Sequence, residues 1–477
     1  MSTTVKPASS RRFYADSALL ASSRAAALGS GFILIVYLAR RLGPVDFGCF
    51  TAVLAYSGWL QLAATTPVHA PLVTALARHR AGQPDPLPIG LLVASGLGLL
   101  LAAGLALGAG PITASLGHPQ AALAARLAGI DVFAGSLGSV ATAALNGRGR
   151  HRAATAVFLL HPTTRLLACI ALVEAGHGPL GAVAGTAMAS CIQAVAALAV
   201  LAGSLHLAWP KGFRQILRES APLAVLSAVL RTMQSIDLLG VVVTRSTPEI
   251  GIYGSAHRLA GAAAFVNSSS TLVAIQELSS AHTCGDARRA RAIASRQVEL
   301  GLLSAGALLA VAPAAPDLAV LALGPKYAGH GNLFIWFAAA TAARLFLANS
   351  LVLVKITRET ARTTWTVLAG LAGISIFLLC AGDLRLASIA AGTAVVAGLV
   401  GVVTVRRALR LWGAPWPARV SIGVLAGLLA AGCFGLASTG MSVWLRAAFC
   451  ELLFAALALG VGRWPVWSAR LRHLAAR

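Results

Sequence analysis

The chain has 477 residues, of which 57% are hydrophobic and only 11% are charged. This balance lies far outside that of soluble globular proteins and excludes a protein that works as a folded domain in water. The formal net charge of +23 does not indicate nucleic-acid binding, because the sequence has no soluble domain to carry a basic face or an aromatic-basic stripe.

Apolar runs, each long enough to cross a bilayer, follow one another along the whole chain. They predict an all-α polytopic membrane protein with about 14 transmembrane helices, separated by loops too short to fold alone. In chain order the predicted spans are 18–40, 46–68, 88–110, 121–145, 153–174, 178–203, 221–244, 250–276, 297–323, 331–354, 363–382, 386–410, 418–438 and 442–463.

Lysine and arginine gather in every second loop between these spans. The intervening loops hold few basic residues, namely Arg40, Arg41, Arg245, Lys326 and Arg385. Because basic loops stay on the cytoplasmic side of a membrane, both termini are predicted to be cytoplasmic, and the number of spans is predicted to be even.

Two loops of the predicted ladder carry similar sequences. The junction between the first and second spans is RLGPVDFGCF, over 41–50, and the junction between the seventh and eighth is RSTPEIGIY, over 245–253. Both run arginine, proline, acid, glycine and aromatic, and both join the first two helices of successive six-span groups. An internal duplication explains this match.

The duplication predicts two six-helix lobes with a central cleft. The N-terminal lobe is expected over 1–204 and the C-terminal lobe over 205–412, followed by an additional helix pair and a cytoplasmic tail over 413–477. Because six is even, the two lobes would enter the membrane in the same direction. Rocking of two such lobes about their cleft implies transport by alternating access.

Several ionisable side chains fall inside predicted spans, where each costs about 2.5–3.5 kcal/mol unless it is paired or solvated. Asp237 and Arg258 are expected at similar depths in the antiparallel spans seven and eight, so they are predicted to meet. Their pairing would be either a structural salt bridge or a gating or proton-coupling pair. Asp131, at mid-depth in span four, would be either a helix-joining hydrogen-bond acceptor or a coupling-ion site.

Three further arginines, Arg24, Arg231 and Arg344, have no acid at a matching depth in an adjacent span. We therefore expect them to point into the cleft, with interhelical pairing as the alternative for each. The planar guanidinium group suits bidentate contact with phosphate oxygens, so these arginines favour an anionic cargo. Together with Arg258 they are the candidate substrate-binding residues, and Asp131 and Asp237 are the candidate coupling or gating residues.

The segments that carry the duplication also resemble a known family. The stretch from Ala39 to Gly48, and the segments Ser220 to Pro222, Ile236 to Asp237 and Gly251 to Leu259, resemble the polysaccharide-biosynthesis branch of the multidrug/oligosaccharidyl-lipid/polysaccharide exporter superfamily. That branch includes O-antigen-type flippases, and the lipid II flippase is a more distant relative.

The resemblance implies a flippase of the bacterial inner membrane. Such a protein moves an undecaprenyl-diphosphate-linked oligosaccharide across the bilayer for the assembly of polysaccharide, including lipopolysaccharide, and makes or breaks no bond. Its partners would be the anionic lipid-linked substrate, membrane lipids, and a polymerase and glycosyltransferases. Protons, sodium ions or the membrane potential could each drive it through Asp131 or Asp237.

Two other functions compete with this hypothesis. A multidrug-type antiporter of the same superfamily would export cations, and a polytopic polyprenyl-dependent glycosyltransferase would need clustered carboxylates or histidines on a substantial outer loop. The seven cysteines are scattered without a C-x-x-C pair, and no H-E-x-x-H, P-loop, G-x-S-x-G or dinucleotide fingerprint occurs. We therefore expect no metal, no cofactor and no enzymatic activity.

Overall fold

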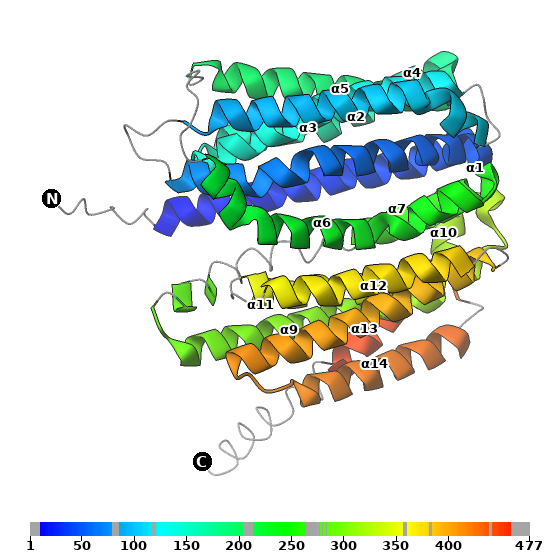
Figure 1. The fold of residues 1–477 in the computed structure, drawn as a ribbon. Coiled ribbons are helices and arrows are strands. Elements are labelled where there is room, and N and C mark those ends of the chain that lie inside the picture. The colour runs from blue at the N-terminus through cyan, green and yellow to red at the C-terminus, as the bar shows by residue number, and fades with distance from the viewer. Residues whose placement is uncertain are drawn as a thin grey trace, which may run out of the picture. The chain divides into compact units, whose positions relative to one another are not determined.

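The computed structural model describes residues 10–78, 85–115, 121–203, 213–263, 274, 277–278, 280–282, 284–355, 360–380, 384–437 and 441–458. Over these residues every regular element is a helix, which confirms the predicted all-α class. Figure 1 shows most of them as long ribbons.

The described residues include nine helices that are long and apolar enough to cross a membrane. Two of these, over 22–69 and 151–202, are 48 and 52 residues long, whereas about 20 residues suffice for one crossing. Both contain a break in the helix, so each has the length for two crossings. The protein is therefore a multi-pass membrane protein, while the predicted total of about 14 spans is not confirmed. Parts of the predicted spans 250–276 and 442–463 lie outside the described residues.

The break in the first of these long helices falls at the junction predicted between spans one and two. Helix α1 extends over Ser10–Arg78, and Gly43 within it has φ 75° and ψ 177°. Only glycine takes such a positive φ without strain, and the following Pro44 has no N–H to continue a helix. Figure 1 shows α1 as two helical arms that meet at a bend. The glycine-proline pair thus forms a corner that needs no separate loop.

Contacts between Cα atoms divide the chain into two compact units. Unit 1 comprises Met1–Ala228 and Arg245–Gly251, and unit 2 comprises Val229–Thr244 and Ile252–Arg477. Helix α6 (Phe213–Thr244) therefore contributes its first half to unit 1 and its second half to unit 2, and α7 (Thr247–Ala263) begins in unit 1. The lobes over 1–204 and 205–412 and the separate helix pair remain predictions.

Unit 1 is built around helix α3. It contains α2 (Leu87–Ser115), α3 (Ala122–Gly147), α4 (His151–Leu172) and α5 (Gly178–Ala202), joined between α4 and α5 by a single wide turn of helix, η2 (Val173–His177). Helix α3 packs against α1, α2 and α5, and α4 packs against α1 and α5. Small residues allow these close approaches, as expected for membrane helices. A Cβ on Gly185 of α5 would lie only 2.6 Å from the backbone nitrogen of Cys169 in α4.

Unit 2 contains the remaining helices, in which α11 packs against both α9 and α13. Its bounds are α9 Ala287–Ala310, α10 Ala315–Leu323, α11 Gly331–Lys355, α12 Thr360–Cys380, α13 Leu386–Trp412 and α14 Ala418–Ala437, with a last described helix over 443–458. Helix α14 packs against α9, where Val424 and Phe454 belong to one buried apolar cluster with Ala310. An ion pair between Arg446 and Asp317 ties the last helix to α10.

The predicted span 297–323 differs from the structure at its start and in its middle, whereas its end coincides with the end of α10 at Leu323. Helix α9 begins at Ala287, because the Asp286 side chain caps it by accepting a hydrogen bond from the backbone N–H of Arg289 at 2.9 Å. It ends at Ala310, and a short turn of 3-10 helix, η4 (Ala312–Ala314), leads into α10. Pro313 and Pro316 lie at this break and remove two backbone donors, which explains why the apolar run does not form one helix.

Residues 44–48 and 247–251, which belong to the two similar junctions, meet inside unit 1. A Cβ on Gly48 would lie 2.0 Å from the carbonyl oxygen of Thr247 and 3.0 Å from the nitrogen of Gly251. A Cβ on Gly251 would in turn lie 1.9 Å from the carbonyl oxygen of Pro44 and 3.0 Å from the nitrogen of Gly48. The glycine that the two junctions share is therefore required by a reciprocal contact between backbones, which leaves no room for a side chain at either position.

Candidate functional site

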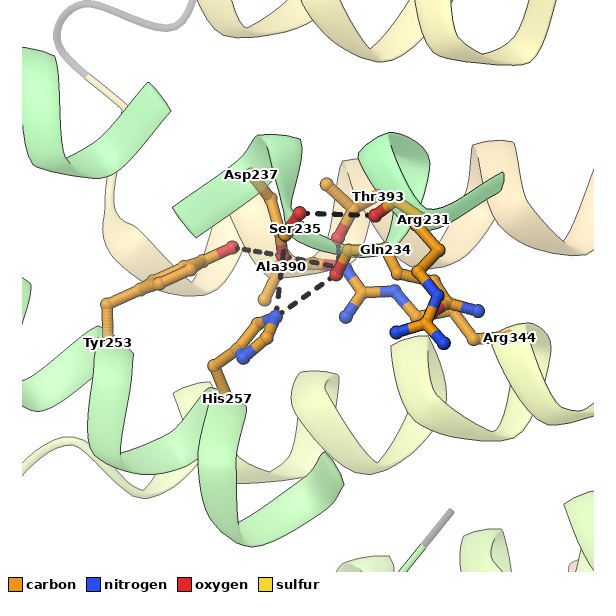
Figure 2. A network of polar contacts seen from close by, with 9 residues as sticks. All are labelled: Arg231, Gln234, Ser235, Asp237, Tyr253, His257, Arg344, Ala390 and Thr393. Atoms are coloured by element: carbon orange, nitrogen blue, oxygen red, sulfur yellow. Dashed lines mark hydrogen bonds and ion pairs between the residues drawn. The ribbon is translucent and has the colours of Figure 1, made fainter. Parts of the chain in front are cut away.

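A buried carboxylate, Asp237, lies at the centre of a polar cluster in unit 2. Its side chain, on α6, has no exposed surface. Arg344 of α11 donates from Nη2 to Oδ2 of Asp237 at 2.7 Å, and the hydroxyl of Tyr253 of α7 donates to the same oxygen at 3.0 Å. Figure 2 shows these side chains converging on the carboxylate. The carboxylate thus connects three helices of the unit through charged and hydroxyl donors.

The second oxygen of this carboxylate faces a histidine. Nε2 of His257 lies 3.9 Å from Oδ1 of Asp237 and 3.2 Å from the backbone carbonyl oxygen of Gln234. No donor among the described residues forms a hydrogen bond with Oδ1 itself. Tyr253 and His257 are four residues apart, so they share one face of α7. The carboxylate is therefore held firmly on its Oδ2 side and only loosely on its Oδ1 side (Figure 2).

Aromatic packing keeps this face of α7 in place. The rings of Tyr253 and His257 both meet the ring of Phe337 edge to face, with centroid distances of 4.7 Å and 5.8 Å. Such contacts add about 0.5–1.5 kcal/mol beyond burial. On the α13 side, the Thr393 hydroxyl donates to the carbonyl oxygen of Ala390 at 2.8 Å, so it is occupied within its own helix.

The structure corrects two predictions about charge pairing. The predicted Asp237–Arg258 pair is wrong, because the arginine bound to Asp237 is Arg344. The prediction that Arg344 has no acid at its depth is wrong for the same reason. The position of a residue in a span gives its depth in the membrane. A side chain meets a partner only if its direction around the helix also matches, and the sequence alone does not give that direction.

The remaining candidate arginines have different surroundings. Arg231 lies on α6, its side chain is exposed, and no described acid pairs with it. In Figure 2 the side chains of Arg231 and Arg344 extend to the same side of Asp237. Arg258 is half-buried on α7 next to His257, and Arg24 is half-buried on α1 in the other unit. Two of the four predicted arginines are thus brought together in unit 2, beside a carboxylate that engages only one of them.

The other predicted acid, Asp131, is buried in unit 1. Its Oδ1 accepts a hydrogen bond from the Ser190 hydroxyl at 2.6 Å, which links α3 to α5. This is the helix-joining hydrogen bond that was one of the two predicted alternatives. Its role as a coupling-ion site stays a prediction.

Sequence reasoning missed the residues that complete both networks. Tyr253 and His257 surround Asp237, and His161 and Ser190 lie beside Asp131. The sequence contained a signal for Tyr253 and His257, because two polar aromatic residues four positions apart lie on one face of a membrane helix. Among the described residues, no group of three or more histidine, cysteine, aspartate and glutamate side chains could hold a metal ion.

A comparison with family models identifies this chain's relatives. The family model described as "Polysaccharide biosynthesis protein" matches residues 13–276, which is more than half of the chain. No curated protein sequence matches it.

Solved structures share the fold at low sequence identity. The lipid II flippase MurJ in an inward closed conformation is similar over 96% of this chain and 99% of its own, with 13% identity and a TM-score of 0.74. An inward-facing multidrug resistance MATE transporter of the MOP superfamily is similar over 82% of this chain and 98% of its own, with 15% identity and a TM-score of 0.62. At these identities the likeness establishes the fold alone.

Proposed function

The chain belongs to the polysaccharide biosynthesis protein family, and we propose that it is a flippase of the MOP exporter superfamily that moves an undecaprenyl-diphosphate-linked oligosaccharide. The similar solved structures include a flippase of another lipid-linked precursor, lipid II, which supports a cargo of this class. The protein would release the cargo chemically unchanged in the outer leaflet. It would therefore act as a transporter and not as an enzyme.

The arginines beside Asp237 support an anionic cargo. Arg344 is engaged by Asp237, and Arg231 is exposed beside it without a described acid partner. A guanidinium group in a membrane helix needs a compensating anion or water, and a diphosphate supplies four or more oxygens for it. We assign the first contact with the diphosphate to Arg231, with Arg344, Arg258 and Arg24 as further substrate-binding residues. Arg231 is the observation on which this assignment rests.

The transport cycle follows from the predicted architecture. Two six-helix lobes, over 1–204 and 205–412, would open a cleft alternately to the two sides of the bacterial inner membrane, with both termini in the cytoplasm. Asp131 and Asp237 would couple or gate this movement. A polysaccharide polymerase and glycosyltransferases would act before and after the flippase on the same lipid-linked glycan.

Replacing Arg231 by alanine is expected to slow translocation of a fluorescently labelled undecaprenyl-diphosphate oligosaccharide in proteoliposomes by about tenfold to a hundredfold, because one charge-assisted contact of about 1.5–3 kcal/mol is lost. The melting temperature should change little, since Arg231 pairs with no described acid. Arg231→Lys keeps the charge without the planar fork and should fall between the two.

The matched control for this experiment is Arg126→Ala. Arg126 is also an exposed arginine of a membrane helix, α3, and the proposal gives it no contact with the cargo. Equal translocation rates for Arg231→Ala and Arg126→Ala would contradict the proposed diphosphate contact. Equal rates for the wild type and for a variant with Arg24, Arg231 and Arg344 all changed to alanine would contradict the whole arginine site.

A multidrug-type antiporter is the second candidate function, because MATE transporters are also among the similar structures. Export of cationic dyes from vesicles by the purified protein would favour it. The arginines beside Asp237 argue against a cationic cargo, since like charges would meet in the same cluster.

A further inference from the structure

Asp131 of unit 1 is the end of a hydrogen-bonded chain that crosses three helices. The Ser190 hydroxyl on α5 donates to Oδ1 of Asp131 at 2.6 Å, and its oxygen lies 3.3 Å from Nε2 of His161 on α4. A hydroxyl group has a single proton. When Ser190 donates it to Asp131, Nε2 of His161 must carry the proton that points toward the Ser190 oxygen. The chain therefore has a direction, from His161 through Ser190 to Asp131.

The acceptor end of this chain is more buried than its histidine end. Asp131 is 6% exposed and Ser190 is 1% exposed, whereas His161 is only half-buried. Gly135 makes room for the network, because a Cβ at this position would lie 1.7 Å from Nε2 of Gln61 and 3.4 Å from Oγ of Ser190. The inner end of the chain is thus a sequestered carboxylate, and the outer end is the more exposed imidazole group, whose ring nitrogens can both accept and donate a proton.

The groups that face Asp131 favour a proton over a metal cation. From α4 come His161, Arg165 and Cys169, and from α5 comes Cys191 in addition to Ser190. From α1, the Ser57 hydroxyl contacts the carboxylate and Nε2 of Gln61 donates to the backbone carbonyl oxygen of Asp131 at 3.4 Å. A sodium ion would lie close to the positive charge of the Arg165 guanidinium group, whereas a proton adds no volume and needs no ligand shell.

We infer that His161, Ser190 and Asp131 form a proton-binding relay, with His161 as the entry group and Asp131 as the acceptor. Starting from an imidazolium group and a carboxylate, the Ser190 proton passes to Oδ1 of Asp131 while the Nε2 proton of His161 passes to the Ser190 oxygen. One N–H bond breaks, one O–H bond forms on Asp131, and the serine hydroxyl is regenerated. A neutral imidazole and a neutral carboxylic acid remain, and charge and protons balance.

Arg165 interacts differently with the ionised and the protonated forms of Asp131. Its Nε donates to the Thr186 hydroxyl at 3.2 Å, and its charge acts on both Asp131 and His161. When Asp131 is ionised, this guanidinium group compensates the carboxylate. When Asp131 is protonated, the guanidinium group loses that interaction and can rearrange. That this proton is the coupling ion of transport rests on the function proposed above, but the binding of the proton does not.

The direct test is infrared difference spectroscopy of the full-length protein in lipid nanodiscs, between mildly acidic and alkaline pH. We expect a protonated-carboxyl band that is lost on alkalinisation in the wild type and is absent in Asp131→Asn. Glu451→Gln is the control, because Glu451 is a half-buried acid of a different helix, the described helix over 443–458. This variant should retain the band. Retention of the band in Asp131→Asn, or a change in it when choline replaces sodium, would overturn the proposal.

The relay is tested by the rate of the same band after a pH jump. Ser190→Ala and His161→Gln should each slow its response by about a hundredfold, the effect typical of losing a positioned proton-transfer group. Ser190→Cys, which restores a transferable proton, should recover part of the rate. Wild-type rates in both Ser190→Ala and His161→Gln would exclude the relay, even if Asp131→Asn failed to fold. None of these measurements needs a lipid-linked cargo, so failed translocation with an intact carboxyl signal would count against the proposed function alone.

Discussion

Alanine in place of Gly48 or Gly251 should destabilise the protein by about 1–3 kcal/mol, at the upper end of this range for overpacking. The added Cβ atoms would lie 2.0 Å and 1.9 Å from carbonyl oxygens of the backbone, namely those of Thr247 and Pro44. Backbone atoms have no rotamer to adopt, so the two segments themselves must separate. Thermal melting in detergent, followed by tryptophan fluorescence, measures the loss.

The chain supplies matched controls on the same two helices. At Gly58 of α1 and at Gly261 of α7, the Cβ atom of an alanine would have no atom within 4 Å of it, so alanine there should be neutral or should stabilise the helix by about 0.5–1 kcal/mol. A loss of stability at Gly48 and Gly251, but not at Gly58 and Gly261, would therefore come from the backbone contact and not from the helix propensity of alanine. Equal melting temperatures for Gly48→Ala and Gly58→Ala would contradict the contact.

A native thiol reports where the structure opens in these variants. Cys49 is 7% exposed and directly follows Gly48. If Gly48→Ala or Gly251→Ala separates the two junctions, a maleimide should modify Cys49 faster than in the wild type, as read by peptide mass spectrometry. The exposed Cys284 is an internal reference whose modification rate should stay constant.

Neutralising Asp237 is expected to cost about 3–5 kcal/mol of stability, the range found when one partner of a buried ion pair is removed. In Asp237→Asn the guanidinium group of Arg344, whose side chain is 13% exposed, loses its anion in a low-dielectric interior. Tyr253→Phe removes one neutral donor from the same carboxylate and should cost about 1 kcal/mol. Thermal melting of the purified variants measures both effects.

A double-mutant cycle distinguishes the ion pair from other roles of Asp237. The variant with both Asp237→Asn and Arg344→Gln carries no unpaired charge, so its melting temperature should lie well above that of Asp237→Asn alone. If the two losses simply add, the 2.7 Å contact does not contribute to stability. Translocation should not recover in the double variant, because Arg344 is also a proposed contact of the cargo.

The sequence predicted the positions of the helices better than the side-chain pairs that join them. The lengths of the apolar runs and the turn residues between them located the corner at Gly43, because a glycine-proline pair between two apolar runs is a strong signal for a turn. They did not locate the break at 311–314, because Pro313 and Pro316 stand inside an apolar run that has the length of a complete span. Mean hydropathy reflects the free energy of transferring side chains into lipid. It does not depend on where a proline removes a backbone hydrogen bond, so it does not reveal such a break.

The acids and arginines of the candidate site were predictable from the sequence, but the residues that complete their networks and the geometry were not. The rule that charged groups are costly in a bilayer drew attention to Asp237, Arg344 and Asp131, each of which has a charged or hydroxyl partner in the structure. It could not identify Arg344 as the partner of Asp237, because the two are 107 positions apart and meet only through the packing around α6 and α11. His161 was missed because an isolated histidine in an apolar run has no local pattern that separates it from a packing residue.

The reciprocal contact of Gly48 and Gly251 has an evolutionary consequence. Gly48 contacts the segment that contains Gly251, and Gly251 contacts the segment that contains Gly48. Such reciprocal contact between equivalent residues is the pattern of an isologous interface in a two-fold dimer. If the two halves arose by the predicted duplication, an unfused ancestor would have associated with a second copy of itself through this glycine, and gene fusion would have preserved the contact in one chain. Each half then constrains the other, because a larger residue in either copy is excluded by the backbone of its counterpart.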